Sequence, residues 1–199
     1  MNVGVLALQG DFLEHIDMLD RLGVRAKLVK TPKDLDSIGA LVFPGGESTT
    51  MSKLLESSGL GEALKARLEL PIFGTCAGLI LLARSISDGR PDQVSFGYLD
   101  VEVRRNGFGR QIRSFEADLD VLEISPPPMK AVFIRAPVIE KVGSDVKVMA
   151  TVSYDFNGKE ESVPVVVRQG RYLASAFHPE LTGDTRLHEY FLQHIVESR

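Results

Sequence analysis

Short strand-like runs recur along the first half of this sequence, and most are followed by a turn and a segment of helical periodicity. The runs begin at residues 3, 24, 40 and 71. The first of them, VGVLAL at 3–8, is almost entirely apolar, which is typical of a strand buried on both faces of a parallel sheet. Strands that alternate with helices form parallel sheets with right-handed crossovers. The pattern therefore predicts an α/β fold with an open, mostly parallel, twisted sheet flanked by helices.

Helices are expected where apolar residues recur every three or four positions. One such segment lies between Asp11 and Gly23, a second starts near Thr49, a third follows Cys76, and the last starts near Asp184. The apolar residues predicted to face the core in three of these helices are Leu13, Ile16, Leu19 and Leu22, then Met51, Leu54 and Leu55, and finally Leu187, Phe191 and Ile195.

The pattern changes between residues 97 and 167. Short strand-like runs (YLDVEV, AVFIRA, VKVMATV and VPVVV) alternate there with glycine, proline and charged turns. This spacing favours an antiparallel extension of the sheet. A buried strand returns at 172–177. The 199 residues, of which 44% are apolar, suit one compact domain spanning residues 1–199.

Charge and composition narrow the classes of partner. The formal net charge of −4 gives no general basic field for nucleic acid. No apolar stretch reaches the roughly 18 residues needed to span a bilayer, so we expect a soluble protein with no membrane partner. A sequence with one cysteine forms no internal disulfide, which fits a reducing, cytoplasmic location.

Four turns follow predicted strands, at Gln9-Gly10 and at residues 44–48, 74–78 and 178–180. Ligands of open α/β sheets bind beyond the carboxyl ends of the strands. The turns are distant in sequence, but this rule places them at the same edge of the sheet. We therefore expect them to form one site.

Cys76 lies in GTCAG, the cysteine counterpart of the G-x-S-x-G nucleophile elbow between a strand and a helix. Glycines on both sides permit a tight turn and leave the thiol projecting at the helix N-terminus, where the positive end of the helix favours a thiolate. The pattern predicts a nucleophile that attacks a carbonyl carbon. The alternative is a small buried apolar residue, the commoner role of a lone cysteine.

His178 ends an apolar strand, and Glu180 follows two residues later. In an extended segment both side chains point the same way, so that the carboxylate can orient the imidazole. His178 would take the proton of Cys76 and later give it to a leaving amine, while Glu180 stabilises the imidazolium. A histidine at the end of a strand is otherwise usually structural or solvated.

The turn 44–48 (PGGES) and the basic cluster 104–113 (RRNGFGRQIR) each have two interpretations. The turn is either an ordinary glycine turn capped by Ser48 or Thr49, or a place where backbone N–H groups approach a ligand. In the second case the N–H groups of Gly46 and Ala77 would form an oxyanion hole. The cluster is either a solvated loop or, with Arg135, a source of arginines for a substrate carboxylate.

With these motifs, the sequence resembles the class I, triad-type glutamine amidotransferases. More narrowly, it is similar to the glutaminase subunits of two-subunit pyridoxal 5′-phosphate synthases, the PdxT/SNO family. The similar segments run through nearly the whole chain: GVLALQGDFLEH at 4–15, PGGESTT at 44–50, FGTCAGLILLA at 73–83, RRNGFGRQIRSFEADL at 104–119, VFIRAP at 132–137 and FHPELT at 177–182.

The resemblance implies hydrolysis of L-glutamine to glutamate and ammonia, without a metal or cofactor. The ammonia would pass through a tunnel to a synthase subunit within a large hetero-oligomer. Cys76 matches the family's nucleophile, and His178 and Glu180 match its charge-relay pair. The positions that match glutamine-contacting residues are Gly46, Glu47, Ser48, Arg105, Ile134 and Arg135. Gln9 and Gly10 match the family's loop near the oxyanion hole and the partner interface.

Two stretches are less similar to the family, DGRPDQVSFG at 88–97 and YDFNGKEESVP at 154–164. Both are expected to lie away from the motifs. Three other functions stay open at this stage: a glutaminase of another pathway, a non-hydrolytic cysteine protein of stress response or redox sensing, and an enzymatically silent interaction subunit.

Overall fold

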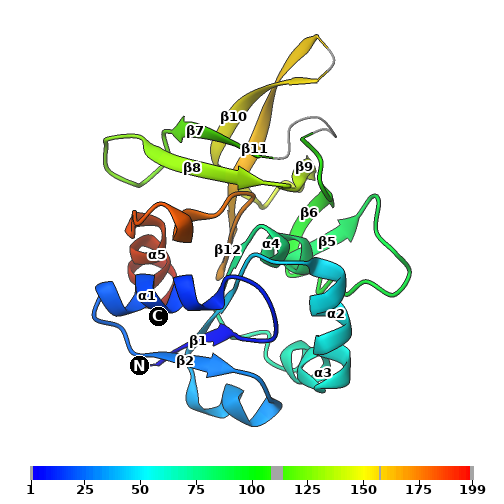
Figure 1. Cartoon of the computed structure of the whole chain (residues 1–199), viewed down its shortest axis with the longest axis vertical. Coiled ribbons are helices and arrows are strands. Elements are labelled where there is room, and N and C mark those ends of the chain that lie inside the picture. The colour runs from blue at the N-terminus through cyan, green and yellow to red at the C-terminus, as the bar shows by residue number, and fades with distance from the viewer. Residues whose placement is uncertain (1, 109–113, 157, 198–199) are drawn as a thin grey trace.

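The structure, a computed structural model, describes residues 2–108, 114–156 and 158–197. Its centre is a seven-stranded sheet in the order β10-β11-β12-β4-β3-β1-β2 within these described residues (Figure 1). The strands from β12 to β2 are parallel, and β10 and β11 add the antiparallel extension. The bounds are β1 Val3–Leu6, β2 Ala26–Val29, β3 Ala40–Phe43, β4 Ile72–Thr75, β10 Lys147–Phe156, β11 Lys159–Gln169 and β12 Tyr172–Ser175. The predicted fold class is confirmed.

Helices cover both faces of this sheet. Helices α1 and α5 lie together on one side in Figure 1, and α2, α3 and α4 lie on the other. Their bounds are α1 Phe12–Arg21, α2 Ser48–Ser57, α3 Leu60–Lys65, α4 Ala77–Leu82 and α5 Arg186–Phe191. Short 3-10 helices occupy Pro32–Ser37 and Pro179–Leu181, and a π turn at Leu192–Val196 follows α5. No helix in the described part of the chain is long and apolar enough to cross a bilayer.

The remaining strands form two small sheets instead of joining the antiparallel extension. Strands β5, β6 and β9 form one, and β7 and β8 form the other. Their bounds are β5 Ala83–Ile86, β6 Leu99–Arg104, β7 Ser114–Leu119, β8 Met129–Ile134 and β9 Val138–Val142. The β10–β11 hairpin, which contains the less family-like turn, projects from the body at the top of Figure 1. The expectation that 154–164 lies away from the motifs was wrong, because the Tyr154 hydroxyl donates to the Phe108 carbonyl oxygen and the Tyr154 ring packs against Phe115, both in the 104–119 segment.

The inward face of α1 differs from the expected one. Leu13 is 63% exposed, whereas His15, Met18 and Leu19 are buried. The helix packs against both the sheet and α5, and the contact with α5 is made by His15, which hydrogen bonds to His188. The other predicted core residues fit better, because Met51 and Leu55 of α2 and the whole predicted set of the last helix are buried.

Glycines set how closely α4 can approach the strands beneath it. A Cβ atom on Gly78 would lie 2.2 Å from the carbonyl oxygen of Phe43, and one on Gly74 would lie 2.7 Å from the carbonyl carbon of Gly78. Real Cβ atoms do not come so near to a backbone. The helix that follows Cys76 can therefore rest on β3 and β4 only because both positions lack side chains.

We expect Gly78→Ala to destabilise the fold by about 1–3 kcal/mol, the usual cost of overpacking a core. Gly61→Ala is the control, because its Cβ atom would meet the Leu55 carbonyl oxygen at an ordinary 3.4 Å. In α3 that change should be neutral or stabilising by up to about 1 kcal/mol. Urea unfolding of both variants measures the difference. Equal free energies of unfolding would contradict the packing argument.

Candidate functional site

A cleft of about 390 Å³ opens beyond the carboxyl ends of the parallel strands, within the range of roughly 300–1,000 Å³ typical of small-ligand sites. It is lined by Gln9, Gly10, Asp11, Gly46, Glu47, Ser48, Cys76, Ile80, Arg105, Asn106, Ile134, Arg135, His178 and Leu181. The four predicted turns thus meet at one place. Among the residues predicted for the site, only Ala77 and Glu180 do not line this cleft.

Cys76 joins β4 to α4 in a strained backbone conformation, with φ 47° and ψ −101°. Such a conformation costs a residue with a side chain about 1–3 kcal/mol and persists only where the surroundings hold it. Here the Cys76 N–H donates to the carbonyl oxygen of Ser175 at 2.9 Å, and the Cys76 carbonyl accepts from Ile80 N at 3.3 Å. The side chain is 6% exposed and lies at the cleft. The predicted elbow is therefore present, and its thiol is reachable.

His178 and Glu180 form a buried pair beside this thiol. Nδ1 of His178 lies 2.7 Å from Oε1 of Glu180, and the two residues are 4% and 6% exposed. The expectation of an extended segment was wrong. After His178 the chain enters the 3-10 helix Pro179–Leu181, and this turn folds the carboxylate back onto the imidazole. Ala77, the first residue of α4, is buried directly after Cys76.

The electrostatics of the pair favour a charged imidazole. Burial alone lowers the pKa of His178, but hydrogen bonds and charge interactions with Cys76 and Glu180 outweigh it and raise the pKa to about 10. Burial raises the pKa of Glu180, and the hydrogen bond from His178 opposes that rise. The arrangement can hold a proton on His178 while a negative charge develops on either neighbour.

The turn after β3 lies against the turn after β1. Oε1 of Gln9 accepts a hydrogen bond from the Glu47 N–H at 2.8 Å, and the Asp11 N–H donates to the Gly45 carbonyl oxygen at 3.1 Å. Side chains are excluded here, since a Cβ atom on Gly10 would lie 1.8 Å from the Gly45 oxygen. Gly46 is exposed, with φ 153°. The loop of Gln9 and Gly10 therefore directly braces the turn that carries Gly46.

Glu47 caps α2, a role that the sequence suggested for Ser48 or Thr49. Its carboxylate accepts from the N–H groups of Thr49 and Thr50 at 3.1 and 2.7 Å, and from the Thr50 hydroxyl at 2.6 Å. Burial alone raises the pKa of Glu47, but these hydrogen bonds outweigh it and lower the pKa to about 2. Glu47 therefore keeps its negative charge at the cleft over the whole physiological range.

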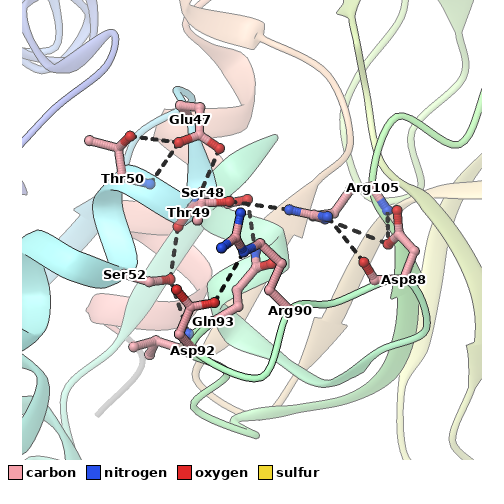
Figure 2. A network of polar contacts seen from close by, with 11 residues as sticks. Glu47, Ser48, Thr49, Thr50, Ser52, Asp88, Arg90, Asp92, Gln93 and Arg105 are labelled. Atoms are coloured by element: carbon pink, nitrogen blue, oxygen red, sulfur yellow. Dashed lines mark hydrogen bonds and ion pairs between the residues drawn. The ribbon is translucent and has the colours of Figure 1, made fainter.

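Arg105 is held by a polar network, shown in Figure 2, that includes the stretch 88–97. Its guanidinium donates to the Thr49 hydroxyl at 3.2 Å and to the Asp88 carbonyl oxygen at 3.0 Å. In the same network the Gln93 amide donates to the Ser48 hydroxyl at 2.8 Å. The expectation that 88–97 lies away from the motifs was wrong, because this stretch supports two residues of the cleft.

Ile134 and Arg135 reach the cleft from the end of β8. Arg135 has a positive φ of 45° and is exposed, and Ile134 is 38% exposed. The carbonyl oxygen of Ile134 lies 3.9 Å from the Cys76 sulfur. These positions put the Arg135 backbone turn near the nucleophile. The end of the basic cluster, at 109–113, lies outside the described residues.

Among the described residues, Asp11, His178 and Glu180 form a group that could hold a metal ion, with donor atoms within 4.8 Å of one another. The His178 Nδ1 atom is already hydrogen bonded to Glu180, and it lies 3.4 Å from the Asp11 carboxylate. A metal would have to displace the proton that joins His178 to Glu180. The donor set fits a proton relay better than a metal centre.

Comparison with known proteins decides the family. The model of the SNO glutamine amidotransferase family matches residues 5–197. The chain belongs to the SNO glutamine amidotransferase family. A curated relative from Rhodococcus jostii, named pyridoxal 5′-phosphate synthase subunit PdxT, is 54% identical over 192 residues, covering 96% of this chain and 95% of the relative. A relative of the same name from Thermus thermophilus is 54% identical over 194 residues, covering 96% of each chain.

One solved structure is similar to the chain in both sequence and fold, and a second is similar in fold alone. A crystal structure of a glutamine amidotransferase superposes with a TM-score of 0.85 at 49% identity, covering 96% of this chain and 97% of the other. The structure of PurLQS from Thermotoga maritima has a TM-score of 0.61 at 16% identity, covering 97% of each chain. The second likeness shows a shared fold alone.

Sequence reasoning about this SNO family member missed four residues that line the cleft: Asp11, Ile80, Asn106 and Leu181. Two signals were available. Asp11 and Asn106 each adjoin a predicted site residue, and Ile80 lies four residues, about one helical turn, after Cys76. The contacts of Gln93 and Asp88 had no comparable signal, because they depend on the path of a loop.

We expect Glu47→Gln to lower the stability of the fold by up to about 1 kcal/mol at pH 7, since it removes the charged cap of α2. The folded pKa lies below the usual 4.5, so the contribution of Glu47 is present above that value and is lost as the pH falls toward about 2. Urea unfolding between about pH 7 and pH 2.5 measures it.

The matched control is Glu56→Gln, an exposed glutamate on the same helix. Its effect on the free energy of unfolding at pH 7 should be small. A constant difference between wild type and Glu47→Gln across the acidic range would contradict the capping role.

Proposed function

We propose that this chain hydrolyses L-glutamine to L-glutamate and ammonia, as the glutaminase subunit of a pyridoxal 5′-phosphate synthase. The observation that carries the proposal is the contact of three groups: a thiol on a strained elbow, an imidazole beside it, and a buried carboxylate that binds Nδ1 of that imidazole. Membership of a glutamine amidotransferase family and the name shared by close relatives support the same reaction.

The first half-reaction forms a thioester. The Cys76 thiolate attacks the carboxamide carbon of glutamine, and the carbonyl π electrons move to oxygen to give a tetrahedral oxyanion. The oxyanion then collapses, the carbon–nitrogen bond breaks, and His178 gives its proton to the departing nitrogen, which leaves as ammonia. Glu180 keeps the imidazole oriented for this transfer, because it binds Nδ1 and leaves Nε2 for the reacting groups.

The second half-reaction releases glutamate. His178, now neutral, takes a proton from a water molecule as the water oxygen attacks the thioester carbon. The carbon–sulfur bond breaks, the new γ-carboxyl group loses its remaining proton to solvent, glutamate leaves, and the Cys76 thiolate and the imidazolium are restored. The N–H groups of Gly46 and Ala77 are proposed to donate to the oxyanion in both halves, and one such donor is typically worth about 3 kcal/mol.

Charged groups at the cleft suit an amino acid substrate. The guanidinium groups of Arg105 and Arg135 would bind the α-carboxylate. Glu47, which stays ionised, would face the α-ammonium group, and Ser48 and Ile134 would complete the cleft. We also propose that the loop of Gln9 and Gly10 contacts a synthase subunit in a large hetero-oligomer, and that the ammonia passes to that subunit through a tunnel. The same proposal includes a single domain over residues 1–199 and a cytoplasmic location. The reaction requires no metal or cofactor.

We expect Cys76→Ala to abolish ammonia release from glutamine in the presence of the synthase partner, because the thioester can no longer form. Assembly with the partner should be preserved, since Cys76 is only 6% exposed. A coupled ammonia assay and co-purification measure the two properties. Wild-type ammonia release by the variant would overturn the catalytic assignment.

We expect Arg105→Met to raise the KM for glutamine about 10- to 100-fold, the loss expected for a hydrogen bond to a charged group. The kcat should change much less, because the α-carboxylate is bound alike in ground and transition states. Arg104→Met is the control, since Arg104 pairs instead with Glu140 at 2.9 Å. An equal rise in KM for both variants would contradict the proposed contact.

A further inference from the structure

A second polar cluster lies behind the triad and takes no part in the proposed mechanism. It consists of His15 on α1, Thr75 at the end of β4 and His188 on α5, each with 0% of its surface exposed. None of the three lines the cleft. Polar side chains so deeply buried are costly unless each is paired, and the pairing here leads to Glu180.

His15 lies at the centre of the cluster. Its Nδ1 atom is 2.8 Å from Nε2 of His188, and its Nε2 atom is 3.1 Å from the Thr75 hydroxyl and 3.5 Å from Oε2 of Glu180. Oε2 of Glu180 is buried without a hydrogen-bond partner among the described residues. Thus one carboxylate oxygen of Glu180 binds His178, and the other faces His15.

Protonation of the two histidines follows from their surroundings. Burial lowers the pKa of His15 well below its usual value and that of His188 to about 3, so both rings are neutral. Each neutral ring has one N–H and one acceptor nitrogen. Only one of the two nitrogens that face each other, His15 Nδ1 and His188 Nε2, can carry the shared proton.

The carboxylate selects between the two arrangements. If His15 carried its proton on Nδ1, the lone pair of Nε2 would face the charged Oε2 of Glu180, and Nδ1–H of His188 would be a buried donor with no partner among the described residues. With the proton on Nε2, His15 presents an N–H to Thr75 and Glu180, and it accepts from His188. In that arrangement the unpartnered Nδ1 of His188 is only an acceptor. We therefore assign the Nε2–H tautomer to His15.

We propose that His15 is a positioning residue of the triad, and that its Nε2–H holds and stabilises the Glu180 carboxylate that orients His178. The proposal rests on the proposed glutaminase function only for its effect on turnover. Without His15, Oε2 of the buried carboxylate would face no donor, so Glu180 would take up a proton more readily, and neutral Glu180 would no longer stabilise the imidazolium of His178. The thiolate–imidazolium pair would then be lost at a higher pH.

Two other charged groups near Glu180 shift its pKa in opposite directions. The Asp11 carboxylate, on the cleft side, raises the pKa of Glu180, and the His178 charge lowers it. Among the described residues, His188 hydrogen bonds to His15 and not to Glu180. Substitution of His15 therefore tests the loss of the donor to Glu180, and substitution of His188 tests the effect of disturbing the packing of the same cluster.

The test uses the pH dependence of Cys76 alkylation by iodoacetamide in the full chain. Because Cys76 is the single cysteine in the sequence, labelling of the whole protein reports on that thiol alone. Three variants are compared with wild type: His15→Leu, which removes the donor; His15→Gln, which offers an amide N–H at the same distance along the side chain; and His188→Gln, the same exchange one ring further from Glu180. Circular dichroism sets the folded fraction used to normalise each rate.

We expect the acidic midpoint of the alkylation rate to rise by about one pH unit in His15→Leu, and by less than about 0.3 unit in the two glutamine variants. With glutamine and the synthase partner, kcat of His15→Leu should fall about tenfold while KM stays within about twofold. An unchanged midpoint in His15→Leu would overturn the proposal. An equal shift in His188→Gln would also overturn it, by assigning the effect to packing.

The two proposals can fail separately. If wild type releases no ammonia from glutamine with its partner and the midpoints still shift as expected, the glutaminase function fails and the positioning role of His15 stands. If wild type hydrolyses glutamine and His15→Leu matches it in both midpoint and kcat, the positioning role fails alone.

Discussion

Backbone segments at the carboxyl edge of the sheet approach one another more closely than side chains permit, and the site depends on this approach. A Cβ atom on Gly45 would lie 2.3 Å from the His178 ring, and one on Gly10 would meet the Gly45 carbonyl at 1.8 Å. Gly78 lets α4 rest on β3 in the same way. These contacts bring the turns after β1, β3, β4 and β12 together around one thiol. The fold thereby supplies the energy that holds Cys76 at a positive φ.

Behind that thiol, polar and charged side chains follow one another into the interior of the protein. His178 contacts Cys76 and binds one oxygen of Glu180, and His15 faces the other oxygen. The helices α1 and α5 thus cover the sheet and also carry His15 and His188, the linked pair that lies behind the buried carboxylate. On the solvent side, Glu47 accepts hydrogen bonds from N–H groups of α2, and Arg105 donates to the Asp88 carbonyl oxygen in the 88–97 stretch. A fixed polar frame of this kind lowers the reorganisation needed when charge moves in a reaction.

The sequence predicted the parallel sheet and the convergence of its turns, because both follow from local patterns: apolar runs, glycine turns and the G-x-C-x-G elbow. Contacts that depend on the path of a loop or the rotation of a helix were not predictable in this way. Gln93 hydrogen bonds to Ser48, which lies 45 residues earlier in the sequence. In α1, helical spacing predicted that Leu13 faces the core, but His15 is the buried residue and Leu13 is exposed. The 3-10 turn after His178 was also missed, since an HPE segment is equally compatible with an extended chain. The roles of individual cleft residues stay predictions.

The central claim is that Cys76 forms a covalent bond to the substrate within this frame. Rapid acid quenching of the chain with its synthase partner and glutamine, followed by mass spectrometry of the peptide that contains Cys76, tests it most directly. We expect a glutamyl thioester on Cys76 that forms and decays at rates compatible with ammonia release. Ammonia release without any adduct on Cys76, or with the adduct on another residue, would contradict the account.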